Sequence, residues 1–145
     1  MLLRISTCAV ALWFGATAFA DDAARRFDGS WTGDANGSPV TWVFENKGDA
    51  LKVDQMKGGE RLAEFECNTM GRECALKETG KKATVSMWFN GSKLVQLETK
   101  GSEIVRRRFE VNAKGDAMDV EITPISQGGK AETLHLTRAQ VAAQH

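Results

Sequence analysis

The sequence lacks an excess of charge of either sign, because 19 Lys and Arg residues balance 19 Asp and Glu residues in a chain of 145. Nucleic-acid binding normally requires a surplus of basic side chains that displace counterions, so this balance argues against it. Proline is also scarce, with 2 residues against 14 glycines, which excludes a Pro-rich linker and indicates many tight turns. The hydrophobic fraction of 42% is too high for a disordered chain and fits one globular domain.

Familiar catalytic and metal-binding patterns are missing as well. The chain contains no Ser-x-x-Lys, Gly-x-Ser-x-Gly or His-Glu-x-x-His motif, and Glu64 and Glu66 share the ordinary polar face of a strand. Beyond the cysteines, only His135 and His145 offer nitrogen ligands for zinc. We therefore expect no enzymatic activity, no cofactor and no metal.

The N-terminal 20 residues have the pattern of a secretory signal peptide. Arg4 supplies the positive charge, a short apolar run follows, and Ala18-Phe19-Ala20 is a small-x-small cleavage site. The apolar run is shorter than the roughly 20 residues of a membrane-spanning helix, which argues against the alternative of an anchor. We predict a signal peptide over residues 1–20 and a single domain over residues 21–145. The mature chain is expected in the periplasm or the medium, without a transmembrane segment.

Two cysteines, Cys67 and Cys74, remain after removal of that segment. In an oxidising compartment an even pair is most simply a disulfide. The functional alternative is a redox pair, but such pairs usually have the spacing Cys-x-x-Cys, whereas six residues intervene here. We predict a structural disulfide that closes a short loop at a strand-to-strand turn.

Turn residues recur along the chain every 9 to 14 residues or so, as in Asn46-Lys47-Gly48, Lys57-Gly58-Gly59, Asn90-Gly91 and Lys100-Gly101. This regular spacing is typical of an antiparallel all-β meander. Asn90-Gly91 is the strongest hairpin signal, because a type I′ turn requires positive φ at both central positions.

Between the turns, apolar and polar residues alternate with the period of a β-strand, so that Val95 and Leu97, for example, oppose Gln96 and Glu98. Strands with one dry face and one wet face bury the dry faces together when the sheet closes on itself. We predict an all-β, up-and-down antiparallel barrel of about eight to ten strands. The apolar candidates that either fill it or line a cavity for one small ligand are Trp42, Phe44, Phe65, Met87, Phe89, Phe109 and Met118.

The start of the predicted domain, Phe27-Asp28-Gly29-Ser30-Trp31, places a Gly-x-Trp at the opening of the first strand. This resembles the lipocalins and their relatives, which include the avidins and the intracellular fatty-acid-binding proteins. In these families a basic residue of the final strand commonly packs over that Trp. The resemblance therefore implies that Arg138 covers Trp31 and closes one end of the barrel.

The second half of the chain resembles a fatty-acid-binding protein more particularly. Residues 91–97, 104–108 and 137–138 are similar to that family's hairpin, to its strand with an inner Arg and to its final strand. Two departures stand beside this likeness. Only Asn36 to Pro39 lie where the family has two lid helices, and the family's Tyr after the final Arg is missing from a chain without tyrosine. The resemblance thus implies an incomplete ligand triad and no helical portal.

Arg107 is the residue that points most directly to a ligand. The alternation places it inward with Val105, Phe109 and Val111, where a lone guanidinium is costly unless it meets an anion or hydrogen-bond acceptors. One interpretation is that Arg107, alone or with Arg138, binds a ligand carboxylate through two hydrogen bonds. The alternatives are an inward carboxylate, for which the pattern offers no obvious candidate, and a place at the barrel rim.

We predict an exported lipocalin-like protein that binds a small apolar or amphipathic ligand inside the barrel, with an acidic head group as one option. Arg107 would hold the acidic head group, and the apolar contacts would come from Trp42, Phe44, Phe65, Met87 and Phe109. The alternative is an envelope or secreted interaction protein whose barrel is filled. Its outer contact residues would then be Trp88, Arg106 and Arg108.

Overall fold

The computed structural model describes residues 23–76 and 82–139, which form ten β-strands after one helical turn at residues 23–27. The strands are β1 (Gly29–Ala35), β2 (Ser38–Asn46), β3 (Ala50–Lys57), β4 (Glu60–Asn68), β5 (Cys74–Leu76), β6 (Ala83–Asn90), β7 (Lys93–Lys100), β8 (Glu103–Val111), β9 (Ala117–Pro124) and β10 (Glu132–Arg138). The predicted signal peptide and its cleavage site lie outside the described residues. No helix in the described part of the chain is long and apolar enough to cross a membrane.

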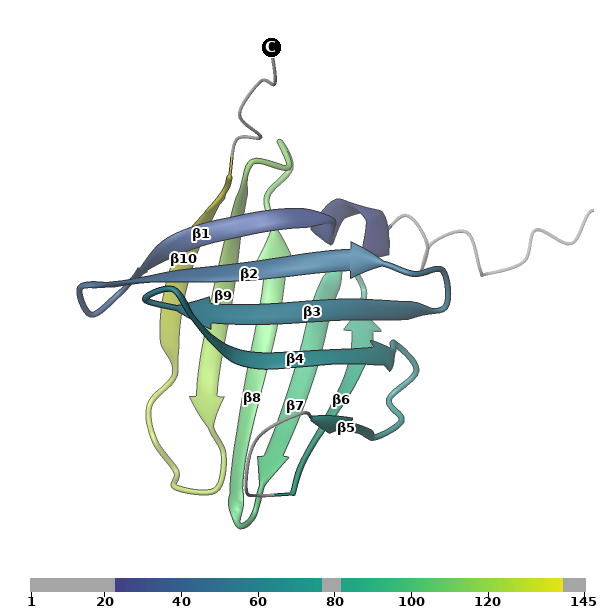
Figure 1. Ribbon diagram of the computed structural model, residues 1–145, viewed down its shortest axis with the longest axis vertical. Coiled ribbons are helices and arrows are strands. Elements are labelled where there is room, and N and C mark those ends of the chain that lie inside the picture. The colour runs from purple at the N-terminus through teal and green to yellow at the C-terminus, as the bar shows by residue number, and fades with distance from the viewer. Residues whose placement is uncertain (1–22, 77–81, 140–145) are drawn as a thin grey trace, which may run out of the picture.

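All ten described strands belong to one antiparallel sheet in the order β4-β3-β2-β1-β10-β9-β8-β7-β6-β5. Neighbours in the chain are neighbours in the sheet, except that β1 pairs with β10 while β4 and β5 are the two edge strands. Figure 1 shows β1 to β4 crossing in front of the upper parts of β6 to β10, so that the sheet curls into a nearly closed barrel. The predicted fold class is confirmed.

Two hairpin turns show how the glycines set the strand ends. The turn between β6 and β7 is centred on Gly91 and Ser92, one residue later than the Asn90-Gly91 predicted from the sequence. Gly91 has a positive φ of 62° and Ser92 does not, which is typical of a type II′ turn rather than type I′. The type I′ pattern occurs between β1 and β2, where Asn36 and Gly37 have φ of 50° and 83°. This two-residue turn leaves no room for a helix between those strands.

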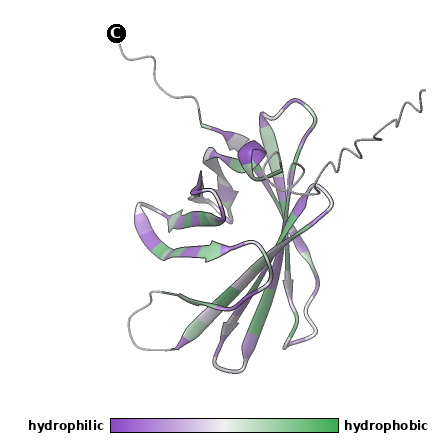
Figure 2. Cartoon of the chain, turned by 90° about the vertical axis from the view of Figure 1, so that its right-hand side faces the viewer, coloured by the Kyte–Doolittle hydropathy of each residue, from purple (hydrophilic) through white to green (hydrophobic). Residues whose placement is uncertain are grey.

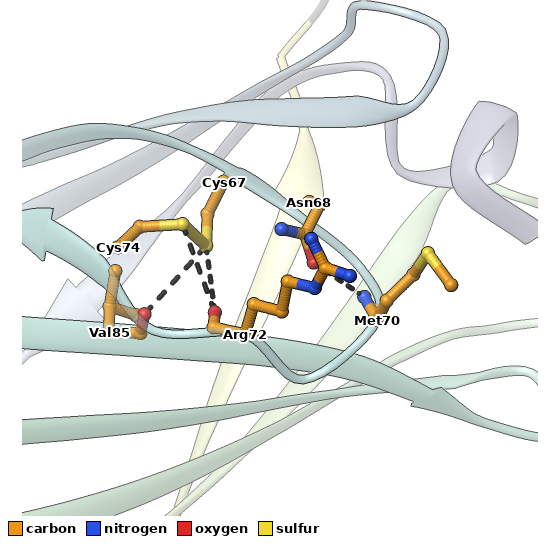
Figure 3. The surroundings of a disulfide bond; sticks show 6 residues. All are labelled: Cys67, Asn68, Met70, Arg72, Cys74 and Val85. Atoms are coloured by element: carbon orange, nitrogen blue, oxygen red, sulfur yellow. Dashed lines mark hydrogen bonds between the residues drawn. A yellow bond between two sulfur atoms is a disulfide. The ribbon is translucent and has the colours of Figure 1, made fainter.

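A disulfide closes the seam between the edge strands β4 and β5 (Figure 3). It joins Cys67 to Cys74, whose Cα atoms are 5.7 Å apart, and both sulfurs lie close to the carbonyl oxygen of Arg72. The loop between the cysteines contacts β6, because Met70 forms a β-bridge with Trp88 of that strand. The predicted structural disulfide is therefore confirmed, and it links the two edges that no strand ladder joins.

Alternation along the strands gives the barrel one hydrophobic interior, and Figure 2 shows hydrophobic and hydrophilic residues following one another along the ribbons. The interior forms one connected cluster of buried side chains. The largest of its fully buried side chains are Trp31, Trp42, Phe27, Phe44, Phe109, Leu51, Met87, Leu94, Met118 and Leu136.

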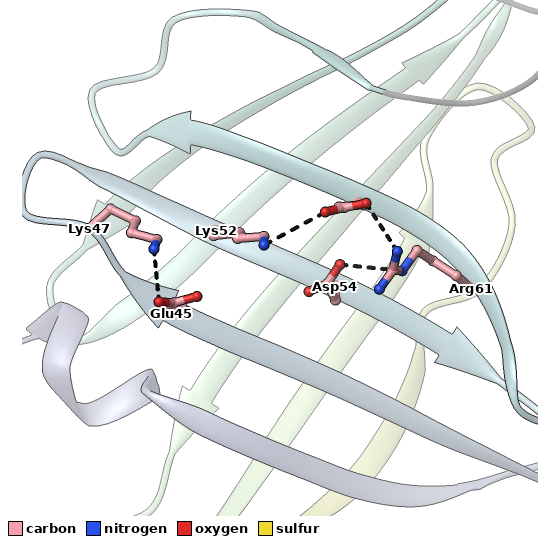
Figure 4. Close-up of polar contacts among 6 residues, drawn as sticks. Glu45, Lys47, Lys52, Asp54 and Arg61 are labelled. Atoms are coloured by element: carbon pink, nitrogen blue, oxygen red, sulfur yellow. Dashed lines mark hydrogen bonds and ion pairs between the residues drawn. The ribbon is translucent and has the colours of Figure 1, made fainter.

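The outer face of β2 to β4 carries ion pairs (Figure 4). The ammonium of Lys47 lies 2.8 Å from the carboxylate of Glu45, and Arg61 lies 3.6 Å from Asp54 and 3.2 Å from Glu64. The hydrogen bond from Lys47 and its charge lower the pKa of Glu45, and the same contact raises the pKa of Lys47. Because water screens exposed pairs, they contribute little to folding.

Candidate ligand site inside the barrel

Trp31 and Arg138 close one end of the barrel. The guanidinium carbon of Arg138 lies 4.2 Å from the centroid of the Trp31 ring, which is a cation–π contact. The guanidinium also donates hydrogen bonds to the carbonyl oxygens of Gly115 (2.9 Å), Arg26 (3.1 Å) and Asp28. All three of its nitrogens are thus engaged by the protein itself. Arg138 thus lies over Trp31, where the resemblance implied it, with its guanidinium bonded to the chain's own carbonyl oxygens.

The helical turn at residues 23–27 fills the same end as a plug. The ring of Phe27 lies 5.8 Å from that of Phe44 and 6.0 Å from that of Phe89, measured between centroids. The carbonyl oxygen of Phe27 accepts a hydrogen bond of 2.8 Å from the indole N–H of Trp31. The plug is therefore tied both to the core and to the closing residue.

Aromatic rings fill the part of the barrel beside the plug. The centroid of the Phe109 ring lies 5.1 Å from that of Trp42 and 5.4 Å from that of Phe44. All three side chains are at most 2% exposed. Rings in such contact pack at the density of a protein interior. This region is termed the closed half, and in it three of the predicted ligand contacts serve as core.

The other end of the interior is only partly buried. Val105, Ile122 and Leu134 face inward from β8, β9 and β10 but keep part of their surface exposed, whereas the inward residues nearer the plug are buried. Arg107 lies opposite Ile122 in the ladder and belongs to the same region. Figure 1 shows the lower parts of β7 to β9 extending past β4. The region defined by Val105, Arg107, Ile122 and Leu134 is termed the open half.

Arg107 faces inward, as the alternation indicated, and it has a protein partner. Its Nη1 donates a hydrogen bond of 2.5 Å to Oε2 of Glu98. The two side chains are only 13% and 15% exposed. The guanidinium carbon also lies 5.5 Å from the centroid of the Trp42 ring, so Arg107 reaches from β8 across to β2. Of the alternatives considered for this residue, the structure shows the pair with an inward carboxylate.

Strand β7 explains why that partner was missed. Gln96 lies opposite Arg107 in the ladder, so Gln96 and Glu98 face inward while Val95 and Leu97 face outward. The expectation of a dry face at Val95 and Leu97 is therefore wrong for this strand. Because Glu98 faces inward, the barrel does contain the inward carboxylate that the alternation pattern did not offer.

Gln96 is a second polar side chain in the interior. It is 2% exposed and lies between Met87 and Arg107 in the sheet. Within residues 23–76 and 82–139, the buried Nε of Arg107 has no hydrogen-bond partner. Buried polar groups are nearly always hydrogen-bonded, so this atom, beside the carboxamide of Gln96, marks a place where a bound molecule can complete the set. Gln96, Glu98 and Arg107 are termed the polar cluster.

The remaining predicted site residues do not join this cluster. Phe65 and Met87 are buried in the walls formed by β4 and β6. Trp88, Arg106 and Arg108 lie on the outer face, as the alternation indicated. Sequence reasoning thus found Arg107 and its neighbour Trp42, and it missed the two β7 residues that complete the polar cluster.

Metal ligands do not gather in the described part of the chain, where no group of three His, Cys, Asp or Glu side chains is placed to hold an ion. His135 lies on the outer face, with its Nδ1 at 2.5 Å from Oδ1 of Asp119. The second histidine, His145, lies outside the described residues. The candidate site is therefore the polar cluster inside the barrel.

Solved structures share this architecture, although no family model and no curated protein matches the sequence. A fatty acid binding protein of Schistosoma mansoni in complex with arachidonic acid has a TM-score of 0.68 at 17% identity, covering 81% of this chain and 99% of that one. Secretory abundant heat soluble protein 4 from Ramazzottius varieornatus has a TM-score of 0.66 at 12% identity, covering 90% and 100%. Fatty-acid-binding protein 1 of Echinococcus granulosus has a TM-score of 0.66 at 7% identity, covering 80% and 99%.

These likenesses define the class of fold. The chain has the β-barrel fold that these fatty-acid-binding and secretory abundant heat soluble proteins also have. At such low identity the likeness extends to the fold alone, because one fold can serve many functions. Function has to be argued from the barrel's own interior.

Proposed function

We propose that this protein binds one small apolar or amphipathic molecule in the open half of its barrel and has no enzymatic role. The observation that carries the proposal is the unequal filling of the interior. Rings occupy the closed half, whereas Val105, Ile122 and Leu134 remain partly exposed around the polar cluster. Ligand sites typically combine an apolar lining with a few well-placed polar groups, and the open half has side chains of both kinds.

The solved structure with arachidonic acid supports the proposal by analogy of fold. In this chain the apolar part of a ligand would lie along the inner faces of β8 to β10. Its polar end would meet the polar cluster, where the buried Nε of Arg107 lacks a hydrogen-bond partner among the described residues. The apolar contacts predicted at Trp42 would be made only at the boundary with the closed half.

Mass spectrometry under native conditions tests this proposal on protein purified gently from its own envelope or medium. We expect a discrete mass above that of the disulfide-bonded chain, and we expect the neutral dye Nile red to brighten on binding. An Ile122→Trp substitution should fill the open half and abolish the dye signal. The matched control is Leu62→Trp, because Leu62 is exposed on β4. A clean apo mass without dye binding would contradict the proposal.

We also propose that the protein works outside the cytoplasm. The disulfide between Cys67 and Cys74 supports this, because disulfides persist in oxidising compartments. The signal-like pattern of residues 1–20 supports it independently. N-terminal sequencing of the protein from the periplasm or medium should begin at Asp21. An uncleaved chain confined to the cytoplasm would contradict export.

One observation favours a second candidate function, in which the outer surface binds a partner. Met70 is 80% exposed and is bridged to Trp88, so two large apolar side chains lie together over β6. Arg106 and Arg108 lie on the outer face of the nearby strand β8. This function becomes the better explanation if the barrel takes up neither a native ligand nor Nile red.

A further inference from the structure

We propose that Glu98 sets the chemistry of the ligand, so that the open half selects a neutral amphipathic molecule, with an alcohol or amide at its polar end, over a carboxylic acid. This inference rests on the proposed function and names the ligand class of the same site. It replaces the acidic head group that the inward Arg107 alone would indicate.

The charge of Arg107 is already matched inside the protein. Its hydrogen bond to Glu98 measures 2.5 Å, and both side chains are more than four-fifths buried. A ligand carboxylate that bound Arg107 would stand beside the carboxylate of Glu98 or displace it. Either arrangement leaves a buried anion without a full partner, which is strongly unfavourable.

The rim of the open half adds no positive surplus. At the ends of the inward faces, Lys100 of β7 lies opposite Glu103 of β8, and Glu132 begins β10. Counted with Arg107 and Glu98, the inward charges of the open half are two positive and three negative, since Arg138 of β10 lies at the other end of the barrel. Such a field repels an anion on its way in and does not act on a neutral molecule.

The groups that remain for a ligand can both donate and accept. The carboxamide of Gln96 has two N–H donors and one acceptor oxygen, and the residue is 2% exposed on the inward face of β7. The Nε–H of Arg107 is a further buried donor without a partner in the described chain. An alcohol or an amide donates and accepts at once, whereas a carboxylate only accepts. The free hydrogen-bonding capacity therefore fits a neutral polar end.

The test compares dodecanol, dodecanamide and dodecanoate, which share one chain length, by displacement of Nile red at neutral pH, where the acid is ionised. For the wild-type protein we expect the two neutral ligands to bind at least about tenfold more tightly than dodecanoate. Glu98→Gln frees Arg107 and should strengthen dodecanoate binding by about tenfold. Dodecanol binding should change little, because Gln96 is untouched.

Two further variants separate this effect from charge and folding. Glu110→Gln makes the same change of charge on the outer face of β8, where Glu110 is exposed, and should leave the ligand preference as in the wild type. The double variant Glu98→Gln/Arg107→Met removes both charges together and should still prefer dodecanol. It provides the comparison even when Glu98→Gln alone does not fold.

The outcomes distinguish this inference from the proposed function. A wild-type preference for dodecanoate, or an unchanged preference in the folded Glu98→Gln variant, overturns the role of Glu98 while the barrel remains a binding protein. Absence of binding by Nile red and by all three ligands overturns the proposed function, and the inference with it.

Discussion

The closed half and the open half of the barrel are built from the same strands with different chemistry. On β8, Phe109 is buried against Trp42 and Phe44, whereas Arg107, two residues earlier, is paired with Glu98 and partly exposed. Under the proposed function, folding energy and recognition are separated along a single strand. Ring burial in the closed half supplies the larger hydrophobic gain, and the polar cluster, to which we assign the selectivity for the ligand, gives up part of that gain.

The largest difference between the halves should appear when a side chain of each is removed from β8. Phe109→Ala deletes a ring packed on two others and should lower the free energy of unfolding by about 3–5 kcal/mol. Val105→Ala deletes a partly exposed side chain and should cost only about 1 kcal/mol. Urea denaturation measures both. Equal losses would break the distinction between the two halves.

The next largest loss of stability should come from removing the disulfide, because it joins the edge strands β4 and β5, which are not paired in the sheet. Replacing both Cys67 and Cys74 by Ala should lower the free energy of unfolding by about 2.5 kcal/mol, the loop-closure value for so short a ring. Urea denaturation of the double variant, beside the reduced wild type, measures the loss. A double variant as stable as the oxidised protein would show that the strands alone hold the barrel closed.

Within the polar cluster, a single substitution should lower the free energy of unfolding, and the matching double substitution should largely restore it. Arg107→Met leaves Glu98 largely buried without its partner and should cost about 2 kcal/mol. Adding Glu98→Gln should bring stability back to within about 1 kcal/mol of the wild type, because no unpaired charge remains. Thermal and urea unfolding of both variants check this. A double variant as unstable as the single one would mean that the ion pair itself stabilises the open half.

The smallest effect should come from the exposed pair on the outside of β2. Lys47 lowers the pKa of Glu45, so the contribution of Glu45 is present above its ordinary pKa of 4.5 and is lost as the pH falls through the lowered folded value. Glu45→Gln should therefore lower the melting temperature only slightly at neutral pH, and not at all in strong acid. Thermal scans at both pH values measure this. A difference that grows in acid would contradict the assigned sign.

The barrel could be predicted from the sequence because strand period and turn spacing are local properties. Inward and outward faces follow from alternation wherever one face is polar, as on β2 and β8. On β7 the apolar run Leu94-Val95 precedes Gln96, so the pattern fits either face. Val95 is buried on the outside, opposite Trp88 in the ladder. A buried apolar residue such as Val95 can thus lie on the outer face beside an aromatic residue, and its burial does not show which face of the strand is the inner one.

The candidate site was predictable only in part for the same reason. Arg107 stood out because a charged residue interrupts an inward apolar series. Its partner Glu98 depends on which residue of β7 faces inward, and that is decided by pairing with β8 rather than by β7 alone. One signal was present in the sequence: an inward arginine requires an inward acceptor, and the neighbouring hairpin strand is the first place to look.

The account depends most directly on where the ligand lies. The decisive measurement is methyl NMR on protein labelled at Ile, Leu and Val, bound to dodecanol, with intermolecular contacts assigned through nuclear Overhauser effects. We predict contacts to Val105, Ile122 and Leu134 and none to Val111 and Leu136, which are buried opposite Met118, nearer the plug. Contacts to Val111 and Leu136 instead would contradict the division of the barrel into a filled half and a binding half.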